Sequence, residues 1–494
     1  MIKLGLALAL ISLPLSTVTP AAGNAAAGTP TPARTSASAL AARTAANAAP
    51  APARSVFVTN IVSNDISTFA IQPNGGLKLS PERTRTDASP RGIAVAPDGR
   101  TAYVANGIAS TITAYRIRTD GGLTALPPPT PTDEDPDDAV VSPDGRRLYV
   151  VNRTAETVSM FPIKDDGTLT SPGKTVPVGG ENPRGIATTP DGRFVFVSTG
   201  NPLDTAPDQL ITFAVHADDG TLTRIAQTGI GAAGGAMALT PDGKYLYVPC
   251  SASHEVFGFR VGSNGDLTSV PGSPFFAPDV PIAAAMTPDG RNLYVTDGGL
   301  IGSGSQHVSA YTVRHDGSLV HDADVTAGDS PVGGAVTPDG RNLYVSNLDS
   351  DNVSAFRIAP GGGLTEIAGS PFPTGGEQPA FQSIAVRPNQ GPVAALSVTG
   401  GAHLDASASS DPDGRVVRYD WDFGDGTTRL DGGPRPAHRF PGPGTYKVTV
   451  TVTDNEGCST EQIFTGTSAL CNGSARARAS ALVPVPAQAA VRLR

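Results

Sequence analysis

The chain has 494 residues, a net charge of −9 and only 16% charged residues, together with 57 glycines and 45 prolines. This length predicts two or more domains, and the glycine and proline content favours short strands joined by tight turns over helical bundles. The negative charge argues against nucleic acid or an anionic membrane surface as a partner.

The N-terminus predicts export. Residues 1–3 are a short basic start, residues 4–18 are apolar, and Ala25-Ala26-Ala27 fits a signal-peptidase site. We therefore expect residues 1–27 to be a signal peptide and the Ala- and Pro-rich residues 28–53 to be a disordered linker. The mature chain has no other long apolar run, so we expect no transmembrane segment and a secreted or cell-envelope location.

A repeat covers residues 54–391 and determines the predicted fold. Pro-Asp-Gly recurs six times, each time after a short apolar run and before an alternating run that ends near Tyr-Val-x-Asn. A third alternating run, a Gly-rich turn and a short fourth run complete each unit. Pro-Asp-Gly forms a tight turn and period-two alternation marks half-buried strands, so each unit is expected to be a four-stranded sheet. Seven such units, about 46 to 51 residues apart, predict a seven-bladed β-propeller. The turn aspartates are Asp98, Asp144, Asp191, Asp242, Asp289 and Asp339.

The two ends of this repeat array predict how the ring closes. The first unit starts at residues 55–60 without a preceding inner strand, and a single inner strand at residues 383–388 follows the last unit. We expect the two to pair, because this pairing removes the open edge of the array.

The sequence changes character after residue 391. Residues 392–467 combine Asp-Gly turns, short alternating strands and the single tryptophan, Trp421, which predicts an immunoglobulin-like β-sandwich with Trp421 in its core. Cys458 and Cys471 are close enough in sequence to form a disulfide, which leaves Cys250 as a buried, unreactive thiol. Residues 468–494 are expected to be a flexible tail.

Two resemblances follow from these motifs. The repeat of Pro-Asp-Gly and Tyr-Val-x-Asn resembles the YVTN propeller repeat and the wider family of lactonase-like propellers, which includes 6-phosphogluconolactonase. The segments DASASSDPDG, YDWDFGDG and VTVTDNEG resemble a PKD domain. The first resemblance implies a seven-bladed propeller with lactonase or cycloisomerase activity. The His expected after Pro-Arg is Gly92 or Gly185 here, and Gly200 replaces an expected Glu, so no catalytic residue is assigned.

One position of the repeat predicts a site. The residue seven before each turn aspartate begins an inner strand and should form a ring at one end of the central channel. Arginines there could hold a carboxylate or phosphate, which makes Arg91, Asp137, Arg184 and Gln382 the candidate ligand-binding residues. The alternative, to which we give more weight, is a salt-bridge network between blades. The seven residues at this ring position are Arg91, Asp137, Arg184, Gly235, Ile282, Val332 and Gln382.

We expect no cofactor, and Ca²⁺ is the one candidate ion. The acidic run at residues 133–138 and the pair Asp411 and Asp413 offer carboxylates for Ca²⁺, but a solvated loop and a turn, respectively, explain them more simply.

These features lead to two functional hypotheses. The first is a secreted or envelope-associated binding or scaffold protein, whose propeller face and PKD domain contact a cell-wall, glycan, protein or small-molecule partner. The second is a lactonase-like hydrolase or cycloisomerase, in which Arg91 and Arg184 bind a small carboxylated or phosphorylated lactone.

Overall fold

The computed structural model describes residues 54–486 except residues 172, 202–204, 299–303 and 401–402. The expected signal peptide and linker lie outside these residues. The regular elements among the described residues are strands and one short 3₁₀ helix, and none of these residues forms a helix long and apolar enough to cross a membrane.

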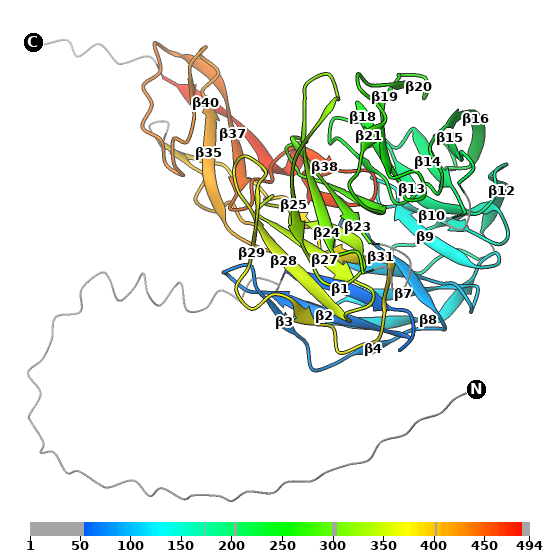
Figure 1. The fold of residues 1–494 in the computed structure, drawn as a ribbon. Coiled ribbons are helices and arrows are strands. Elements are labelled where there is room, and N and C mark those ends of the chain that lie inside the picture. Colours follow the sequence, from blue (N-terminus) through cyan, green and yellow to red (C-terminus); the bar gives the residue numbers. More distant parts are fainter. Residues whose placement is uncertain (1–53, 172, 202–204, 299–303, 401–402, 487–494) are drawn as a thin grey trace, which may run out of the picture. The chain divides into compact units, whose positions relative to one another are not determined.

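Seven antiparallel sheets of four or five strands form the propeller (Figure 1). This confirms the predicted all-β fold and its seven blades.

In each blade the inner strand pairs with a second, the second with a third, and the third with the outer strands. The inner strands are β31 (Pro379–Val386), β5 (Pro90–Val95), β9 (Pro136–Val141), β13 (Pro183–Thr188), β17 (Ala238–Leu239), β22 (Pro281–Met286) and β26 (Pro331–Val336). The second strands are β1 (Ser55–Asn60), β6 (Thr101–Asn106), β10 (Arg147–Asn152), β14 (Phe194–Thr199), β18 (Tyr245–Cys250), β23 (Asn292–Asp297) and β27 (Asn342–Asn347). The third strands are β2 (Asp65–Ile71), β7 (Thr111–Ile117), β11 (Thr157–Pro162), β15 (Gln209–Val215), β19 (Glu255–Val261), β24 (His307–Val313) and β28 (Asn352–Ile358). The outer strands are β3 (Leu77–Leu79), β4 (Thr84–Arg85), β8 (Leu123–Pro131), β12 (Lys174–Pro177), β16 (Leu222–Gly229), β20 (Leu267–Ser269), β21 (Phe275–Phe276), β25 (Leu319–Thr326), β29 (Leu364–Glu366) and β30 (Phe372–Pro373).

The ring closes as the sequence predicts. Strand β31, from the end of the array, pairs antiparallel with β1, from its beginning, with Val58 opposite Ile384 and Val56 opposite Val386. The inner strand missing from the first blade is therefore supplied from the end of the array, which completes this blade and closes the ring.

The repeated motifs each perform a defined structural task. The Tyr hydroxyl of one blade donates to a carbonyl in the Gly-rich turn of the next, as in Tyr103 to Gly167 (3.0 Å) and, across the closure, Tyr344 to Gly75 (2.8 Å). The Asn at the end of the second strand donates to a hydroxyl seven residues on, as Asn152 does to Ser159 (2.9 Å). The repeated Tyr and Asn residues therefore hold each blade together and join it to the next, and they do not indicate a ligand.

The C-terminal module contains a β-sandwich around Trp421, whose exposed fraction is only 2%. Its main sheet has the order β36-β35-β37-β40, of which β35, β37 and β40 are labelled in Figure 1, and a hairpin of β33 and β34 packs Leu404 and Val398 into the same core. A further small sheet has the order β32-β39-β38. The elements are β32 (Asn389–Gln390), β33 (Ser397–Thr399), β34 (His403–Asp405), β35 (Val416–Asp422), β36 (Thr428–Arg429), β37 (Gly444–Asp454), β38 (Gln462–Phe464), β39 (Ala469–Asn472), the 3₁₀ helix η1 (Ala475–Ala477) and β40 (Arg478–Val485).

The structure corrects the expected end of this module. Residues beyond 467 were predicted to be a flexible tail, yet β40 pairs with β37 along eight residues and places Val483 in the core. The sequence of β40 alternates apolar residues, but its Ala, Arg and Pro content is unusual for a strand, and this content favoured the prediction of a tail. Cys458 and Cys471 form the expected disulfide, and Cys250 is a buried free thiol whose pKa is raised by burial.

Candidate functional site

The inner strands give the channel two chemically different ends. The ring position lies at or near the start of each inner strand, and the strand ends just before the turn that leads to the second strand. We call the end at Arg91, Asp137, Arg184, Ile282, Val332 and Gln382 the Arg184 mouth. We call the opposite end, where the inner strands meet the Pro-Asp-Gly turns, the PDG mouth.

Two of the predicted residues form an ion pair at the Arg184 mouth. The Arg91 guanidinium bonds to the Asp137 carboxylate on the neighbouring inner strand and to Asp135, whose Oδ1 lies 2.9 Å from Nη2. Asp135 also binds Arg153, with Nη2 at 2.8 Å. Although burial alone lowers the pKa of Arg91, these carboxylates raise it overall. This half of the site is the predicted network between blades.

Arg184 behaves differently. It is 9% exposed, and its guanidinium makes no hydrogen bond or ion pair with any residue that the structure describes. Its Cζ lies 5.3 Å from the centre of the Phe381 ring. Burial lowers the pKa of Arg184, and Arg153 and Arg91 lower it further, while Asp137 opposes them. A guanidinium remains charged in proteins, so the mouth holds a buried cation with unused donors.

Phe381 reaches Arg184 because β31 contains extra residues. In most blades two residues of the inner strand face one residue of the second strand, as Arg91 and Gly92 do opposite Ala105. In β31 the four residues 380–383 face Thr59 alone, and Gln382 has a positive φ of 56°. The bulge pushes a side chain into the channel, a typical use of bulges near sites.

Asp138 follows the ring position on β9, and its carboxylate bonds to residues of two other inner strands, β13 and β31. Its Oδ1 accepts from the Ala139 amide (2.8 Å) and its Oδ2 from the Ile186 amide (3.2 Å). With its amide nitrogen turned toward Asp138, Gln382 donates to Oδ1 at 2.8 Å and to Oδ2 at 2.5 Å. Burial raises the pKa of Asp138 to about 8 against the opposing effect of the Ala139 and Ile186 amides. Asp138 therefore titrates near neutral pH inside the channel.

The opposite side of the mouth is apolar. Ile282 and Val332 occupy the ring position there and pack with Ala236, Ala283 and Leu348, against which Phe381 also packs. The mouth thus combines a cationic half with an aliphatic and aromatic half. Such a surface suits a small ligand that carries one anionic group and an apolar or ring-shaped body.

The structure brings all four predicted residues to this mouth: Arg91, Asp137, Arg184 and Gln382. Sequence reasoning missed Asp135, Arg153, Asp138 and Phe381. The acidic residues belong to the run at 133–138, whose proximity to the ring position was visible. The position of Phe381 depends on a bulge that no motif marks.

The candidate calcium ligands have other partners. Asp413 forms an ion pair with Arg54 at 3.0 Å, and Asp135 and Asp137 form ion pairs with Arg91. Asp133 accepts a hydrogen bond from the Thr157 hydroxyl. Burial raises the pKa of Asp411 to about 7. No group of three or more metal-ligating side chains occurs among the described residues.

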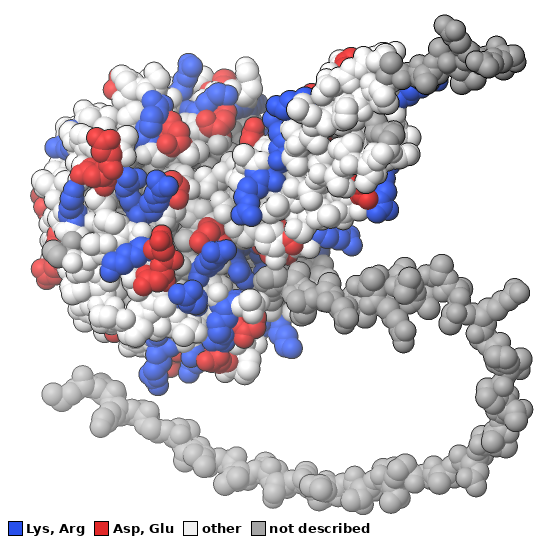
Figure 2. Space-filling model, turned by 180° about the vertical axis from the view of Figure 1, so that it is seen from behind, with Lys and Arg blue, Asp and Glu red and all other residues white. Residues whose placement is uncertain are grey.

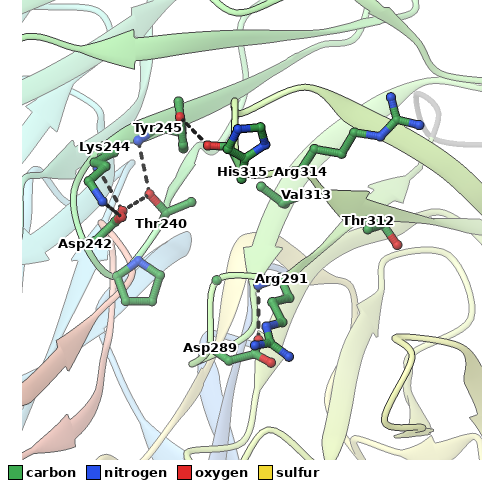
Figure 3. Close-up of a pocket in the computed structure, with 12 residues that line it drawn as sticks. Thr240, Asp242, Lys244, Tyr245, Asp289, Arg291, Thr312, Val313, Arg314 and His315 are labelled. Atoms are coloured by element: carbon green, nitrogen blue, oxygen red, sulfur yellow. Dashed lines mark hydrogen bonds and ion pairs between the residues drawn. The ribbon is translucent and has the colours of Figure 1, made fainter.

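Grooves between blades on the PDG side are a general feature of the repeat. One groove of about 550 Å³ lies between the fifth and sixth units, where Asp242 pairs with Lys244 and Asp289 accepts from the Arg291 amide (Figure 3). Equivalent residues line grooves of about 400 Å³ and 370 Å³ between other blades. In the face seen in Figure 2, basic and acidic side chains alternate without a large area of one sign. These recurring grooves therefore carry no sign of a specialised site.

A closed seven-bladed propeller with a partly cationic channel mouth defines the class of protein. The family model for "Lactonase, 7-bladed beta-propeller" matches residues 45–203, 186–281 and 280–377, and the PKD domain model matches residues 386–467. The chain belongs to this lactonase family of seven-bladed propellers and carries a PKD domain after the propeller.

Solved structures share the propeller at low sequence identity. A Bacteroides uniformis protein described as a candidate 6-phosphogluconolactonase is 20% identical, with a TM-score of 0.59 over 68% of this chain and 99% of that one. The periplasmic gluconolactonase PpgL of Pseudomonas aeruginosa is also 20% identical, with a TM-score of 0.56 over 68% of this chain and 99% of its own. These matches establish the fold alone.

Curated relatives match only short segments. The microbial collagenase of Vibrio alginolyticus is 45% identical over 49 residues, which are 10% of this chain and 6% of that protein. The metalloprotease PrtV of Vibrio cholerae is 42% identical over 64 residues, 13% of this chain and 7% of that protein. The chain thus spans less than a tenth of the curated relatives that it matches.

Proposed function

We propose that this chain is an exported binding protein whose propeller captures a small carboxylate or phosphate ligand at the Arg184 mouth. One observation carries the proposal: Arg184 is buried, its guanidinium makes no hydrogen bond or ion pair with the described residues, and the charge of Asp137 offsets its burial only in part. A buried cation without a partner is costly, and a bound anion would offset that cost. Neighbouring Arg91 is already neutralised by Asp137 and Asp135, so Arg184 is the residue left to bind.

Export is supported by independent features. The apolar segment at residues 4–18 has the length and basic flank of a signal peptide. The disulfide between Cys458 and Cys471 is of a kind that persists in oxidising compartments. The PKD domain would then contribute contacts to a cell-wall, glycan or protein partner outside the cell. Cell fractionation with an antibody tests this part.

The binding test uses calorimetric titration of the mature chain with gluconate, 6-phosphogluconate and glucono-δ-lactone. We expect an anion to bind and Arg184→Ala to weaken binding about 10- to 100-fold, the usual value of a charge-assisted bond. Arg193→Ala is the matched control, because Arg193 pairs with Asp191 in an exposed turn on the PDG side. Equal binding by wild type and Arg184→Ala would exclude this site.

Lactone hydrolysis is the second candidate, favoured by membership of the lactonase family. The mouth offers carboxylates rather than the expected His and Glu, and Asp138, with a pKa of about 8, could exchange a proton near neutral pH. A pH-stat assay with glucono-δ-lactone tests it. Turnover that is lost in Asp138→Asn while anion binding persists would establish hydrolysis, and binding without turnover would leave the binding role.

A further inference from the structure

A segment of the PKD domain leaves its sandwich and enters the propeller. Strands β37 and β40 pair directly along the sandwich, from Gly444 opposite Val485 to Thr451 opposite Arg478. Residues 455–477 between them therefore lie outside the main sheet. They form β38, β39 and η1, and the turn between β38 and β39 is the tip of this hairpin.

The tip is bonded to the inner strands at the PDG mouth. The amide of Thr188 donates to the Gly466 carbonyl at 2.8 Å, and the amide of Leu239 donates to the Thr465 carbonyl at 2.9 Å. The Gln462 side chain donates to the Pro143 carbonyl at 2.8 Å. These groups belong to three consecutive blades, so the hairpin joins them to one another.

The tip is also buried in the channel. Phe464 and Ala469, each 1% exposed, belong to the apolar core that includes Val140 of inner strand β9 and Ile186 of inner strand β13. Leu470, 5% exposed, faces a void of about 30 Å³. The other walls of this void come from four further inner strands, through Ala238, Ala284, Ala285, Met286, Gly334, Ala335, Val336 and Val386.

The base of the hairpin is fixed by a disulfide and by an ion-pair cluster. Cys458 and Cys471 are joined and are 1% and 2% exposed. Just before them, Glu456 binds Arg54, which also binds Asp413 at 3.0 Å. Arg54 precedes the first propeller strand and donates to the Pro388 carbonyl (2.8 Å) after the last one. The PKD domain therefore holds the two ends of the ring together.

We propose that the PKD domain is the closure of the propeller: residues 458–471 plug the PDG mouth, and Asp413 and Glu456 lock the closing blade through Arg54. The channel is then left with one opening, the Arg184 mouth. This role is independent of any ligand, and it makes the PKD domain a part of the propeller rather than a separate spacer.

Gly466 offers a matched test. Its φ is +97°, and a Cβ there would lie 2.6 Å from Leu239 Cδ1 and 3.1 Å from the Leu239 amide nitrogen. Gly426 in the sandwich has a φ of +89° and open space around it. Alanine is strained at both positions, but only at Gly466 does it also collide with the propeller. The readout is hydrogen exchange of the Thr188 and Leu239 amides in the full mature chain.

We expect Gly466→Ala to accelerate exchange of both amides about tenfold or more, and Gly426→Ala to leave them unchanged. A Cys introduced at Ala285, in a Cys250→Ser background, should also react faster with iodoacetamide in Gly466→Ala only. Unchanged exchange and alkylation in a folded Gly466→Ala protein would overturn the proposal.

A milder pair covers the case in which Gly466→Ala does not fold. Leu470→Ala truncates a side chain at the void, whereas Leu482→Ala truncates one that is 68% exposed on β40 of the same domain. Faster exchange of Thr188 and Leu239 in Leu470→Ala alone supports the plug. Equal exchange in both variants refutes it, whatever the outcome of the ligand titrations.

Discussion

The two mouths of one channel are built by the same repeat, yet one is filled by a hairpin and the other is lined by charged side chains. At the PDG mouth the repeat is nearly constant, with Pro-Asp-Gly in six units, and a segment from outside the repeat fills the opening. At the Arg184 mouth the repeat varies from blade to blade, and the buried guanidinium of Arg184 makes no hydrogen bond or ion pair with the part of the chain that the structure describes. Constant positions therefore fold the blades, and variable positions give the channel its chemistry.

The difference has a physical origin. Inner strands carry unpaired amides and small side chains on the channel side, which a hairpin can cover with hydrogen bonds and apolar contacts. The Arg184 mouth has charged groups there, which no apolar hairpin could cover without leaving Arg184 buried and unpaired. One end is thus suited to permanent closure and the other to a reversible ligand.

The largest expected effect comes from breaking the closed end at Arg54. Arg54→Ala leaves Asp413 and Glu456 buried without their cation, which should lower the free energy of unfolding by about 3–5 kcal/mol. Urea unfolding monitored by tryptophan fluorescence measures the change. Arg435→Ala is the control, since the Arg435 side chain is 67% exposed and bonds to Asp405 and Ser407 at the surface, and it should leave the curve nearly unchanged. Equal curves for the two variants would mean that the lock at Arg54 contributes nothing.

The next effect comes from removing the disulfide. Cys458 and Cys471 are 13 residues apart, so replacing both by Ser should cost about 3 kcal/mol of unfolding free energy, chiefly by releasing the unfolded chain. If the hairpin plugs the PDG mouth, the double Cys→Ser variant should also show faster hydrogen exchange at the amides of Thr188 and Leu239. Cys250→Ser, at a free thiol, controls for loss of cysteine. Loss of stability without faster hydrogen exchange at these two amides would mean that the disulfide stabilises the PKD domain alone.

The constant end could be predicted almost completely from the sequence. Pro-Asp-Gly and Tyr-Val-x-Asn fix turn and strand locally, and their spacing gave the seven blades and the pairing of 383–388 with 55–60. The plug could not be predicted in this way. Phe464 and Leu470 are ordinary apolar residues in a short segment, and only the arrangement of two domains shows that a channel receives them.

The variable end could be predicted in part. Counting back from each turn located Arg91, Asp137, Arg184 and Gln382, because equivalent positions of a repeat lie on one ring. Which arginine is paired could not be predicted, since Asp135 joins through a loop with a positive φ of 59°. Phe381 was out of reach because an insertion in β31 shifts the register.

A smaller effect is expected from Asp138. Its pKa of about 8 lies above the unfolded value of about 3.9, so the folded chain holds a proton that the unfolded chain releases. Its contribution to stability is complete below about pH 4 and is lost as the pH rises through 8. Asp138→Asn should remove about 1.4 kcal/mol of the decline for each pH unit between pH 5 and 8, measured by urea unfolding at each pH. The control is Asp166→Asn, in an exposed turn where hydrogen bonds from Thr168 lower the pKa of Asp166. Its unfolding free energy should keep the wild-type dependence on pH over this range. The same wild-type dependence in Asp138→Asn would mean that Asp138 is ionised throughout.

The smallest effect concerns the ring beneath Arg184, and it tests how far the open mouth depends on its bulge. Phe381→Ala removes the aromatic face 5.3 Å from the guanidinium but keeps the charge, so anion affinity should fall about 3- to 10-fold. Phe276→Ala, at a ring that is 73% exposed on an outer strand, should leave the affinity unchanged. The same calorimetric titration measures both. A larger loss in Phe381→Ala than in Arg184→Ala would mean that the ligand is recognised chiefly by its apolar body, and the anion would then be secondary. Affinity equal to wild type would show instead that the extra residues of β31 shape the strand without contributing to binding.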